Sequence, residues 1–245
     1  MIIFVLRLLL LLGWLLPGVL LTLVLWSMRK LGLIGLRRHL RIASGWYGVM
    51  LWLLRVRVHR HGPDIAGSVQ LVSNHISWLD ILVIGSQTQC CFVSKSEVRR
   101  WPVIGFLAAS VATVFLRRGQ GDTQRVLASM LAPIEQQVSV LFFPEGTTTD
   151  GSSVRTFHRR LFALAAERQL PVQPLALRYR HPTQPHPRVP YINQQTLWAN
   201  LQGLLTWPQW IEVDLYVLPV IAADSRNELA RLSQQAIAQS LAQPD

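Results

Sequence analysis

Residues 73–80 read Ser-Asn-His-Ile-Ser-Trp-Leu-Asp and follow an apolar run. They place His75 and Asp80 five positions apart. A histidine at a strand end, followed by a carboxylate in the next turn, can act as a general base that the acid holds and polarises. A structural interpretation stays open, because Ser77 and Asp80 also fit a capping box that opens a helix. Since short motifs recur by chance, the segments downstream decide between the two.

Three further segments lie where predicted strands end or begin. Residues 115–118 (Phe-Leu-Arg-Arg) end one strand with two guanidinium groups, which can bind a phosphate or a carboxylate. Residues 143–147 (Phe-Pro-Glu-Gly-Thr) end another, and their glycine lets a ligand approach backbone amides. Residues 170–174 (Leu-Pro-Val-Gln-Pro) open a third strand. Each segment alone also fits an ordinary turn or strand start.

Short apolar runs alternate with helix-length segments from about residue 66 onward. Strands are predicted at 69–73, 91–94, 113–116, 139–143, 172–177 and 211–218. Helices are predicted at 78–86, 103–110, 123–136, 157–168 and 226–242. This alternation predicts an α/β fold with a mostly parallel sheet flanked by helices. Ligands bind such sheets outside the carboxyl ends of the strands, which is where the suggestive residues fall.

Composition limits the partners and the chemistry. The 245 residues are half hydrophobic, and 24 basic minus 13 acidic residues give a net charge of +11. Such a charge suits a membrane surface, a nucleic acid or an acidic protein. Cys90 and Cys91 are adjacent, which disfavours a disulfide between them and indicates a reducing compartment. No cluster with metal-ligand spacing occurs, so no metal site is predicted.

The N-terminal region predicts membrane attachment. Residues 8–26 are uncharged and long enough to span a bilayer. The heavier basic flank on their C-terminal side predicts that this side, with the catalytic domain, faces the cytoplasm. Pro17 and Gly18 leave a re-entrant hairpin as a second option, with residues 46–54 as its interfacial partner. The leucine-rich run lies beside the basic residues that follow it, which favours the inner, cytoplasmic membrane over nucleic acid as the partner. We divide the chain into an anchoring segment, 1–62, and a catalytic domain, 63–245.

In order and spacing, the segments resemble the glycerolipid acyltransferase family typified by 1-acylglycerol-3-phosphate acyltransferases. Residues 74–80 match its first block, the catalytic His-x4-Asp, and residues 115–118 resemble its second block. Residues 143–147 and 171–174 match the third and fourth. The resemblance covers about residues 65–180, and the membrane-embedded N-terminal segment is also similar to what the family uses. It implies a membrane-bound enzyme that moves a fatty acyl group from a thioester to a lysolipid hydroxyl.

The resemblance also implies roles for individual residues. His75 takes the proton of the attacking hydroxyl and Asp80 orients the imidazole, with no acyl-enzyme required. Amides near Gly146 help to stabilise the oxyanion, and Glu145 positions the acceptor. The predicted acceptor-binding residues are Arg118, Glu145, Gly146, Thr147 and Lys95. The predicted supporting residues are Asn74, Ser77, Phe115 and Pro144. No cofactor is expected beyond the co-substrate, which is acyl-ACP or acyl-CoA.

Two departures from the family pattern bear on the acceptor. Ala112 replaces the glycine usual near the second block, a change expected to have little effect. Residues 148–151 read Thr-Thr-Asp-Gly, where many phosphatidate-forming members carry Ser and Arg. Lysophosphatidate is the leading predicted acceptor, with lyso-ornithine lipid, which is zwitterionic, as the alternative. A basic membrane-anchoring module without catalysis is the alternative from outside the enzymes. Donor, chain length and oligomeric state stay open.

Overall fold

The computed structural model describes residues 2–117, 123–183 and 185–243. Their strands form one seven-stranded sheet in the order β1-β7-β6-β2-β5-β3-β4. The strands are β1 (Val56–His61), β2 (Gln70–Ser73), β3 (Cys90–Lys95), β4 (Val114–Leu116), β5 (Ser139–Phe142), β6 (Val172–Tyr179) and β7 (Ile211–Val217). Every neighbouring pair is parallel except β6 and β7. The predicted α/β fold with a mostly parallel sheet is confirmed.

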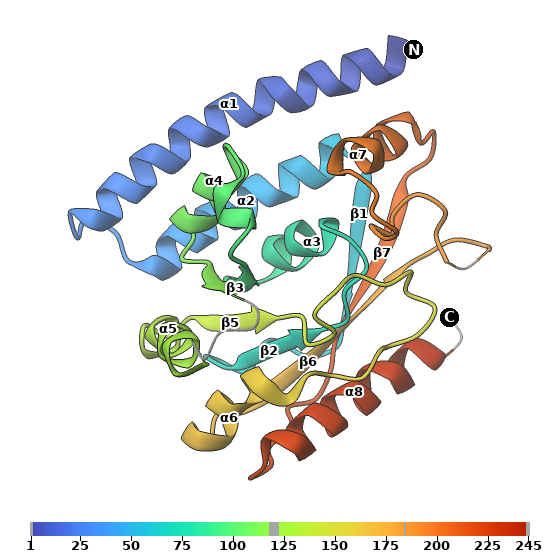
Figure 1. The fold of residues 1–245 in the computed structure, drawn as a ribbon. Coiled ribbons are helices and arrows are strands. Elements are labelled where there is room, and N and C mark those ends of the chain that lie inside the picture. Colours follow the sequence, from blue (N-terminus) through green and yellow to red (C-terminus); the bar gives the residue numbers. More distant parts are fainter. Residues whose placement is uncertain (1, 118–122, 184, 244–245) are drawn as a thin grey trace.

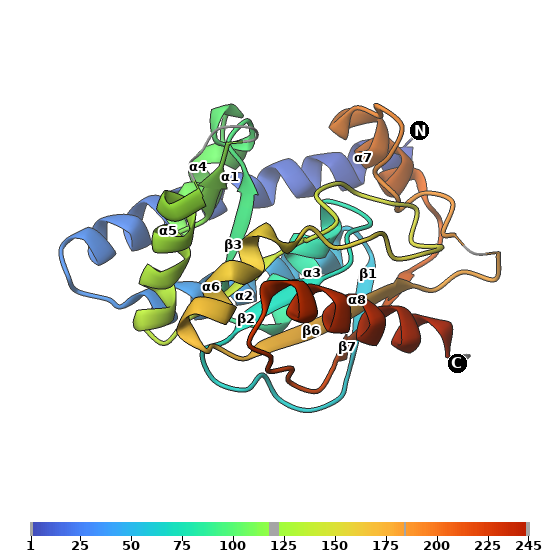
Figure 2. The same ribbon diagram turned by 60° about the horizontal axis from the view of Figure 1, so that its bottom comes forward.

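Helices cover both faces of the sheet, as Figures 1 and 2 show. One face carries α2 (Leu36–Leu53), α3 (Leu79–Gln87) and α7 (Leu197–Thr206), with α1 (Ile2–Lys30) outside α2. The other carries α5 (Thr123–Glu135), α6 (Ala163–Arg168) and α8 (Arg226–Ala242), preceded at α6 by the 3-10 turn η2 (Arg159–Phe162). A second 3-10 turn, η1 (Val98–Arg100), and α4 (Ile104–Ser110) lie between β3 and β4. Because both faces are covered, all four residues of β2 and of β5 are buried.

The carboxyl ends of β2, β5, β3 and β4 meet at one edge of the sheet, because these strands are mutually parallel. His75 follows β2, Glu145 follows β5, Lys95 ends β3 and Arg117 follows β4. The sheet therefore brings four segments that are far apart in sequence into one row, as predicted for ligand sites of parallel sheets.

Helix α1 runs without a break from Ile2 to Lys30, through Pro17. It packs against α2 at Gly18, where a Cβ would lie 2.4 Å from the Trp46 indole nitrogen. At its other end Arg7 donates hydrogen bonds of 2.8 Å to the Leu205 and Trp207 carbonyls beside α7. One helix, Phe4–Lys30, is long and apolar enough to cross a membrane. The re-entrant option therefore reduces to a hairpin of α1 and α2, since no turn forms at Pro17.

Strand β1 and helix α7 are among the elements that were not predicted from the sequence. Strand β1 reads Val-Arg-Val-His-Arg-His, and its polar side chains hide the apolar alternation. It pairs with β7 although it lies within residues 1–62, so the sheet extends across the predicted domain boundary. Helix α7 lies between the predicted strands at 172–177 and 211–218, where no helix was predicted. Thr196 caps it by accepting a hydrogen bond from the Ala199 amide.

Candidate active site

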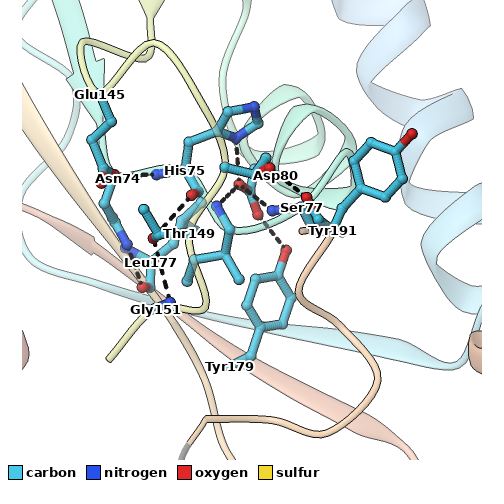
Figure 3. A network of polar contacts seen from close by, with 12 residues as sticks. Asn74, His75, Ser77, Asp80, Glu145, Thr149, Gly151, Leu177, Tyr179 and Tyr191 are labelled. Atoms are coloured by element: carbon cyan, nitrogen blue, oxygen red, sulfur yellow. Dashed lines mark hydrogen bonds and ion pairs between the residues drawn. The ribbon is translucent and has the colours of Figure 1, made fainter. Parts of the chain in front are cut away.

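His75 and Asp80 form a hydrogen-bonded pair at the carboxyl end of β2. His75 Nδ1 lies 2.8 Å from Asp80 Oδ2. The carboxylate is fully buried, whereas 19% of the histidine side chain is exposed. The pair is local: His75 lies in the loop after β2, and Asp80 lies in the first turn of α3. Figure 3 shows the second ring nitrogen of His75 directed away from Asp80, where an incoming hydroxyl can meet it.

Three more donors hold the Asp80 carboxylate. The amides of Ile76 and Ser77 donate to Oδ2 at 2.7 and 2.9 Å, and the Tyr179 hydroxyl donates to Oδ1 at 2.7 Å. Burial, followed by the nearby Asp80 carboxylate, raises the pKa of Tyr179 well above its ordinary value, so the phenol keeps its proton. An ionised carboxylate only accepts hydrogen bonds, so Nδ1 of His75 carries the proton and Nε2 keeps a free lone pair. This is the tautomer that a general base requires.

The capping-box interpretation is partly realised in the same contacts. Asp80 accepts from the Ser77 amide, as the acid of a capping box does. The reciprocal bond is missing, because the buried Ser77 hydroxyl has no hydrogen-bond partner among the described residues. Asp80 therefore serves the helix start and the histidine together.

Phe143 fixes the plane of the His75 ring from the neighbouring segment after β5. The two rings stack with centroids 3.9 Å apart and an interplanar angle of 13°. The backbone of His75 is also tied down, because its amide donates to Glu145 Oε1 at 2.9 Å. The base is thus held at its amide, its ring face and its Nδ1 atom. Such preorganisation favours proton transfer in a single geometry.

Glu145 and Asn74 make backbone contacts. The second Glu145 oxygen accepts from the Arg155 amide at 3.1 Å. Burial raises the pKa of Glu145, and the two amide bonds partly oppose that rise. The Asn74 side chain donates to the Leu177 carbonyl and accepts from the Leu177 amide, at 3.0 and 2.8 Å. The geometry shows Glu145 and Asn74 supporting the loop, whereas the acceptor-positioning role of Glu145 stays a prediction.

Gly146 forms the turn after β5 with φ of +69°, a conformation that favours glycine. Its amide donates to the Phe143 carbonyl at 3.1 Å, and the carbonyl of buried Pro144 accepts from the His158 amide at 2.8 Å. The half-buried Thr147 follows, and then the Thr149 amide donates to the His75 carbonyl at 2.8 Å. The loop of residues 147–150 therefore lies against the candidate base.

Asp150, the last residue of this loop, carries a negative charge. Its Oδ1 atom accepts from the Ser152 hydroxyl at 2.7 Å and from the Ser152 amide at 2.9 Å. These hydrogen bonds, the side-chain one first, lower the pKa of Asp150, and the charge of Arg155 adds a smaller lowering. A cationic group of a bound acceptor would be favoured here, and a phosphate would be disfavoured.

The remaining predicted residues lie farther along the row of strand ends. Lys95 is exposed at the end of β3, and Phe115 is half-buried in β4 with the Arg99 guanidinium 5.4 Å from its ring centre. Arg118 lies outside the described residues. Ala112, in place of the family glycine, has φ of +57°. This conformation costs a non-glycine residue about 1 kcal/mol, which explains why glycine suits the position.

Sequence reasoning did not single out Tyr179 or Phe143 as contacts of the pair. Tyr179 lies 99 positions from Asp80 and two residues beyond the predicted end of its strand. Phe143 was noted only as the start of the third block. Within the described residues, no group of three or more His, Cys, Asp or Glu side chains suits a metal ion.

The chain belongs to the acyltransferase family, whose sequence model matches residues 55–178. The matched segment contains the His75–Asp80 pair, the turn at Gly146 and most of β6. The predictions of the family and of an acyltransferase enzyme are confirmed.

Within this family the chain is similar to curated enzymes of two acceptor types. It is 37% identical over 199 residues to a lyso-ornithine lipid O-acyltransferase of Pseudomonas aeruginosa, covering 80% of this chain and 77% of that protein. It is 39% identical to the Rhizobium meliloti enzyme of the same name, over 55% of this chain and 49% of that protein. It is 31% identical to a 1-acyl-sn-glycerol-3-phosphate acyltransferase of Neisseria gonorrhoeae, over 51% of this chain and 49% of that protein.

The fold also matches a solved structure. The 1-acyl-sn-glycerophosphate acyltransferase of Thermotoga maritima aligns with a TM-score of 0.64 and 18% identity, covering 94% of this chain and 98% of that one. At this identity the match supports the fold, including the N-terminal helices, and leaves the acceptor open.

Proposed function

We propose that this protein transfers a fatty acyl group from a thioester to the free hydroxyl of lyso-ornithine lipid at a membrane surface. The observations that carry the proposal are the His75–Asp80 pair and Asp150, which directly follows the residue whose amide donates to the His75 carbonyl. The first supplies the base for acyl transfer, and the second supplies a charge that suits an ammonium group.

The proposed reaction is a direct transfer. Nε2 of His75 removes the proton of the acceptor hydroxyl as its oxygen attacks the thioester carbonyl. A tetrahedral oxyanion forms, the carbon–sulfur bond breaks, and the imidazolium returns the proton to the leaving thiolate. Asp80 stabilises the imidazolium throughout. The products are an ester and a free thiol.

The charge near the base favours lyso-ornithine lipid as the acceptor. An ornithine headgroup presents an ammonium and a carboxylate, whereas lysophosphatidate presents only a phosphate. The negative charge of Asp150 would attract the ornithine ammonium and repel the phosphate, and the charge of Arg155 would offset part of this effect. The names of the Pseudomonas and Rhizobium relatives support the same acceptor.

Lysophosphatidate, the acceptor favoured from the sequence, is the second candidate. The Neisseria relative carries that name, and Lys95 ends the neighbouring strand as a cation for a phosphate. The preferred acceptor therefore depends on whether Asp150 or Lys95 contacts the lipid headgroup.

Attachment to the membrane fits both acceptors, because each carries a long acyl chain. Helix α1 exposes leucines along its length, and relatives of this kind act on membrane lipids. Placement on the cytoplasmic face is part of the proposal and rests on the basic residues that follow α1.

The test is a panel of lyso-ornithine lipid and lysophosphatidate, each with acyl-ACP and with acyl-CoA as donor. Wild type should acylate lyso-ornithine lipid, and His75→Ala should lose about 10²–10⁴ in rate. Asp150→Arg should raise the KM for lyso-ornithine lipid about tenfold or more and improve the use of lysophosphatidate. Product from lysophosphatidate alone in the wild type would reject the ornithine acceptor. Full turnover by folded His75→Ala would reject the mechanism.

A further inference from the structure

A groove of about 630 Å³ lies at the β4 edge of the sheet, beside the active site and separate from the His75–Asp80 pair. Its walls are the turn between α1 and α2, the segment after β3, strand β4 and helix α5. Five arginines line it: Arg29, Arg99, Arg100, Arg117 and Arg125. Every charged residue among the described residues of the lining is an arginine. We call this the arginine groove.

No acidic side chain is among the described residues that line the arginine groove, although Glu97 and Glu135 adjoin lining residues in the sequence. Within the part of the chain that the structure describes, none of the five guanidinium groups forms an ion pair with a carboxylate. Like charges gathered in a concavity repel one another, and a bound anion removes that repulsion. Guanidinium groups bind phosphate through two parallel hydrogen bonds, and the Thr113 hydroxyl adds a neutral donor.

The size of the groove favours a small polyanion. Its volume falls within the range of small-molecule sites, about 300–1,000 Å³. Two turns of a helix 10–12 Å across would fill about 1,000 Å³, which exceeds the space. Phosphoryl groups on a flexible chain therefore fit the groove better than a helix of a partner protein.

The groove lies within reach of the base. Arg117 and Ser96 follow β4 and β3 at the same carboxyl edge where His75 follows β2. Strands β5 and β3 separate β2 from β4, so three interstrand spacings give about 14 Å between the two sites. An extended chain anchored by a phosphate at one site can deliver its other end to the second.

We propose that the arginine groove binds the phosphoryl group at the base of the donor's phosphopantetheine arm, so that the thioester at the arm's far end reaches His75. This rests on the proposed thioester-dependent acyl transfer. Acyl-CoA and acyl-ACP both carry this arm, so the shared chemistry is a phosphate with a pantetheine chain. The acceptor would then approach from the Asp150 side of the base.

The first experiment measures binding of 4′-phosphopantetheine and of pantetheine, which lacks the phosphate, to the full-length His75→Ala protein by calorimetry. This variant cannot turn over substrate, so the binding result does not depend on the proposed catalysis. We expect 4′-phosphopantetheine to bind at least about tenfold more tightly than pantetheine. Its affinity should fall as the salt concentration is raised. Equal binding of the two ligands would overturn the inference.

Substitutions of single arginines test whether the phosphate binds in the arginine groove. Arg99→Ala and Arg125→Ala each should weaken 4′-phosphopantetheine binding about tenfold, because each removes a charge-assisted hydrogen bond. Both side chains are exposed, so the fold should survive. Arg231→Ala, at an exposed position on α8, is the matched control and should bind as the parent does. Unchanged affinity in both groove variants would overturn the assignment.

Further arms distinguish the two donors and separate this inference from the proposed function. The binding of CoA, holo-ACP and apo-ACP is measured in turn. Arg99→Ala should weaken the binding of either CoA or holo-ACP. Apo-ACP binding as tightly as holo-ACP, with CoA not binding, would overturn the inference, because the phosphate would then contribute nothing. Phosphate-dependent binding without acyl transfer by the wild type would reject the proposed function alone. If the groove variants still transfer acyl groups with an unchanged KM for the donor, the donor-binding role of the arginine groove would be rejected and the proposed function would stand.

Discussion

At the scale of single residues, the candidate base depends on how its carboxylate partner is held. Four hydrogen bonds converge on Asp80, from His75, Ile76, Ser77 and Tyr179. Two of the donors are amides of the same loop, and one comes from a distant strand. The fixed carboxylate holds the His75 ring in one orientation, as the proposed role of a general base requires.

Removing the distant donor should lower catalysis without altering binding. In Tyr179→Phe the ring remains buried, but Asp80 loses one of its four donors. A hydrogen bond to a charged group contributes about 1.5–3 kcal/mol, so we expect kcat to fall about tenfold. The KM for the acceptor should stay the same, since Tyr179 acts through Asp80.

Steady-state kinetics with Tyr216→Phe as the control tests this expectation. Tyr216 lies in β7 and stacks on His61, away from the pair. A rise in KM at constant kcat in Tyr179→Phe would show that Tyr179 contacts the lipid instead.

At the scale of elements, strand β1 is joined to the sheet only through β7. Buried Asp214 of β7 accepts from His61 of β1 at 2.6 Å and also from Arg180 beyond β6. Although burial alone raises it, the pKa of Asp214 is lowered overall by the hydrogen bonds from Arg180 and His61. This carboxylate thus connects the edge strand to the central ones.

The lowered pKa predicts how stability depends on pH. The ordinary pKa of Asp214 is 3.8, so its stabilising effect is complete above that value and is lost as pH falls through the lower folded value. We expect Asp214→Asn to reduce the free energy of unfolding by about 2 kcal/mol at pH 7. The difference from wild type should shrink below about pH 4.

Urea unfolding at a series of pH values measures this effect. Glu212→Gln is the control, since Glu212 pairs with Arg57 and His59 in a half-exposed setting where ion pairs contribute little. If the free energies of unfolding of wild type and Asp214→Asn differ by the same amount down to pH 2, Asp214 does not stabilise the fold through its ionised carboxylate.

Across the whole molecule, α1 lies along one side of the protein (Figure 1). Many of its apolar side chains are exposed. Leu9, Leu16 and Leu20 are 57–66% exposed and fall on one helical face. An exposed stripe of this kind marks a membrane contact more often than a soluble surface.

Substituting the stripe should release the protein from lipid. Leu9→Gln, Leu16→Gln and Leu20→Gln together remove three side chains that each contribute about 1.5–3 kcal/mol when buried in lipid. We expect vesicle flotation to show at least about 100-fold weaker partitioning. Asn227→Ala with Gln239→Ala, both exposed on α8, should float as wild type does. Undiminished flotation of the triple variant would place the membrane contact elsewhere.

Much of this molecule followed from its sequence, because the decisive signals are local. Apolar runs bounded by turns predicted six of the seven described strands, and the spacing of His75 and Asp80 sets their hydrogen bond within one loop. The charge-free stretch within α1 likewise identified the helix that, among the described residues, is long and apolar enough to cross a membrane.

Tertiary structure decided what depends on residues distant in sequence. The Tyr179 donor, the Phe143 stacking and the backbone bonds of Glu145 all cross between strands. The arginine groove joins side chains from four separate segments, and no spacing in the sequence announces it. These residues are neighbours because of the order of the strands in the sheet. That order results from the long-range packing of the sheet and its helices. The spacing of residues within one loop was therefore enough to predict the hydrogen-bonded pair of His75 and Asp80, whereas its surroundings come from strands that only folding brings together.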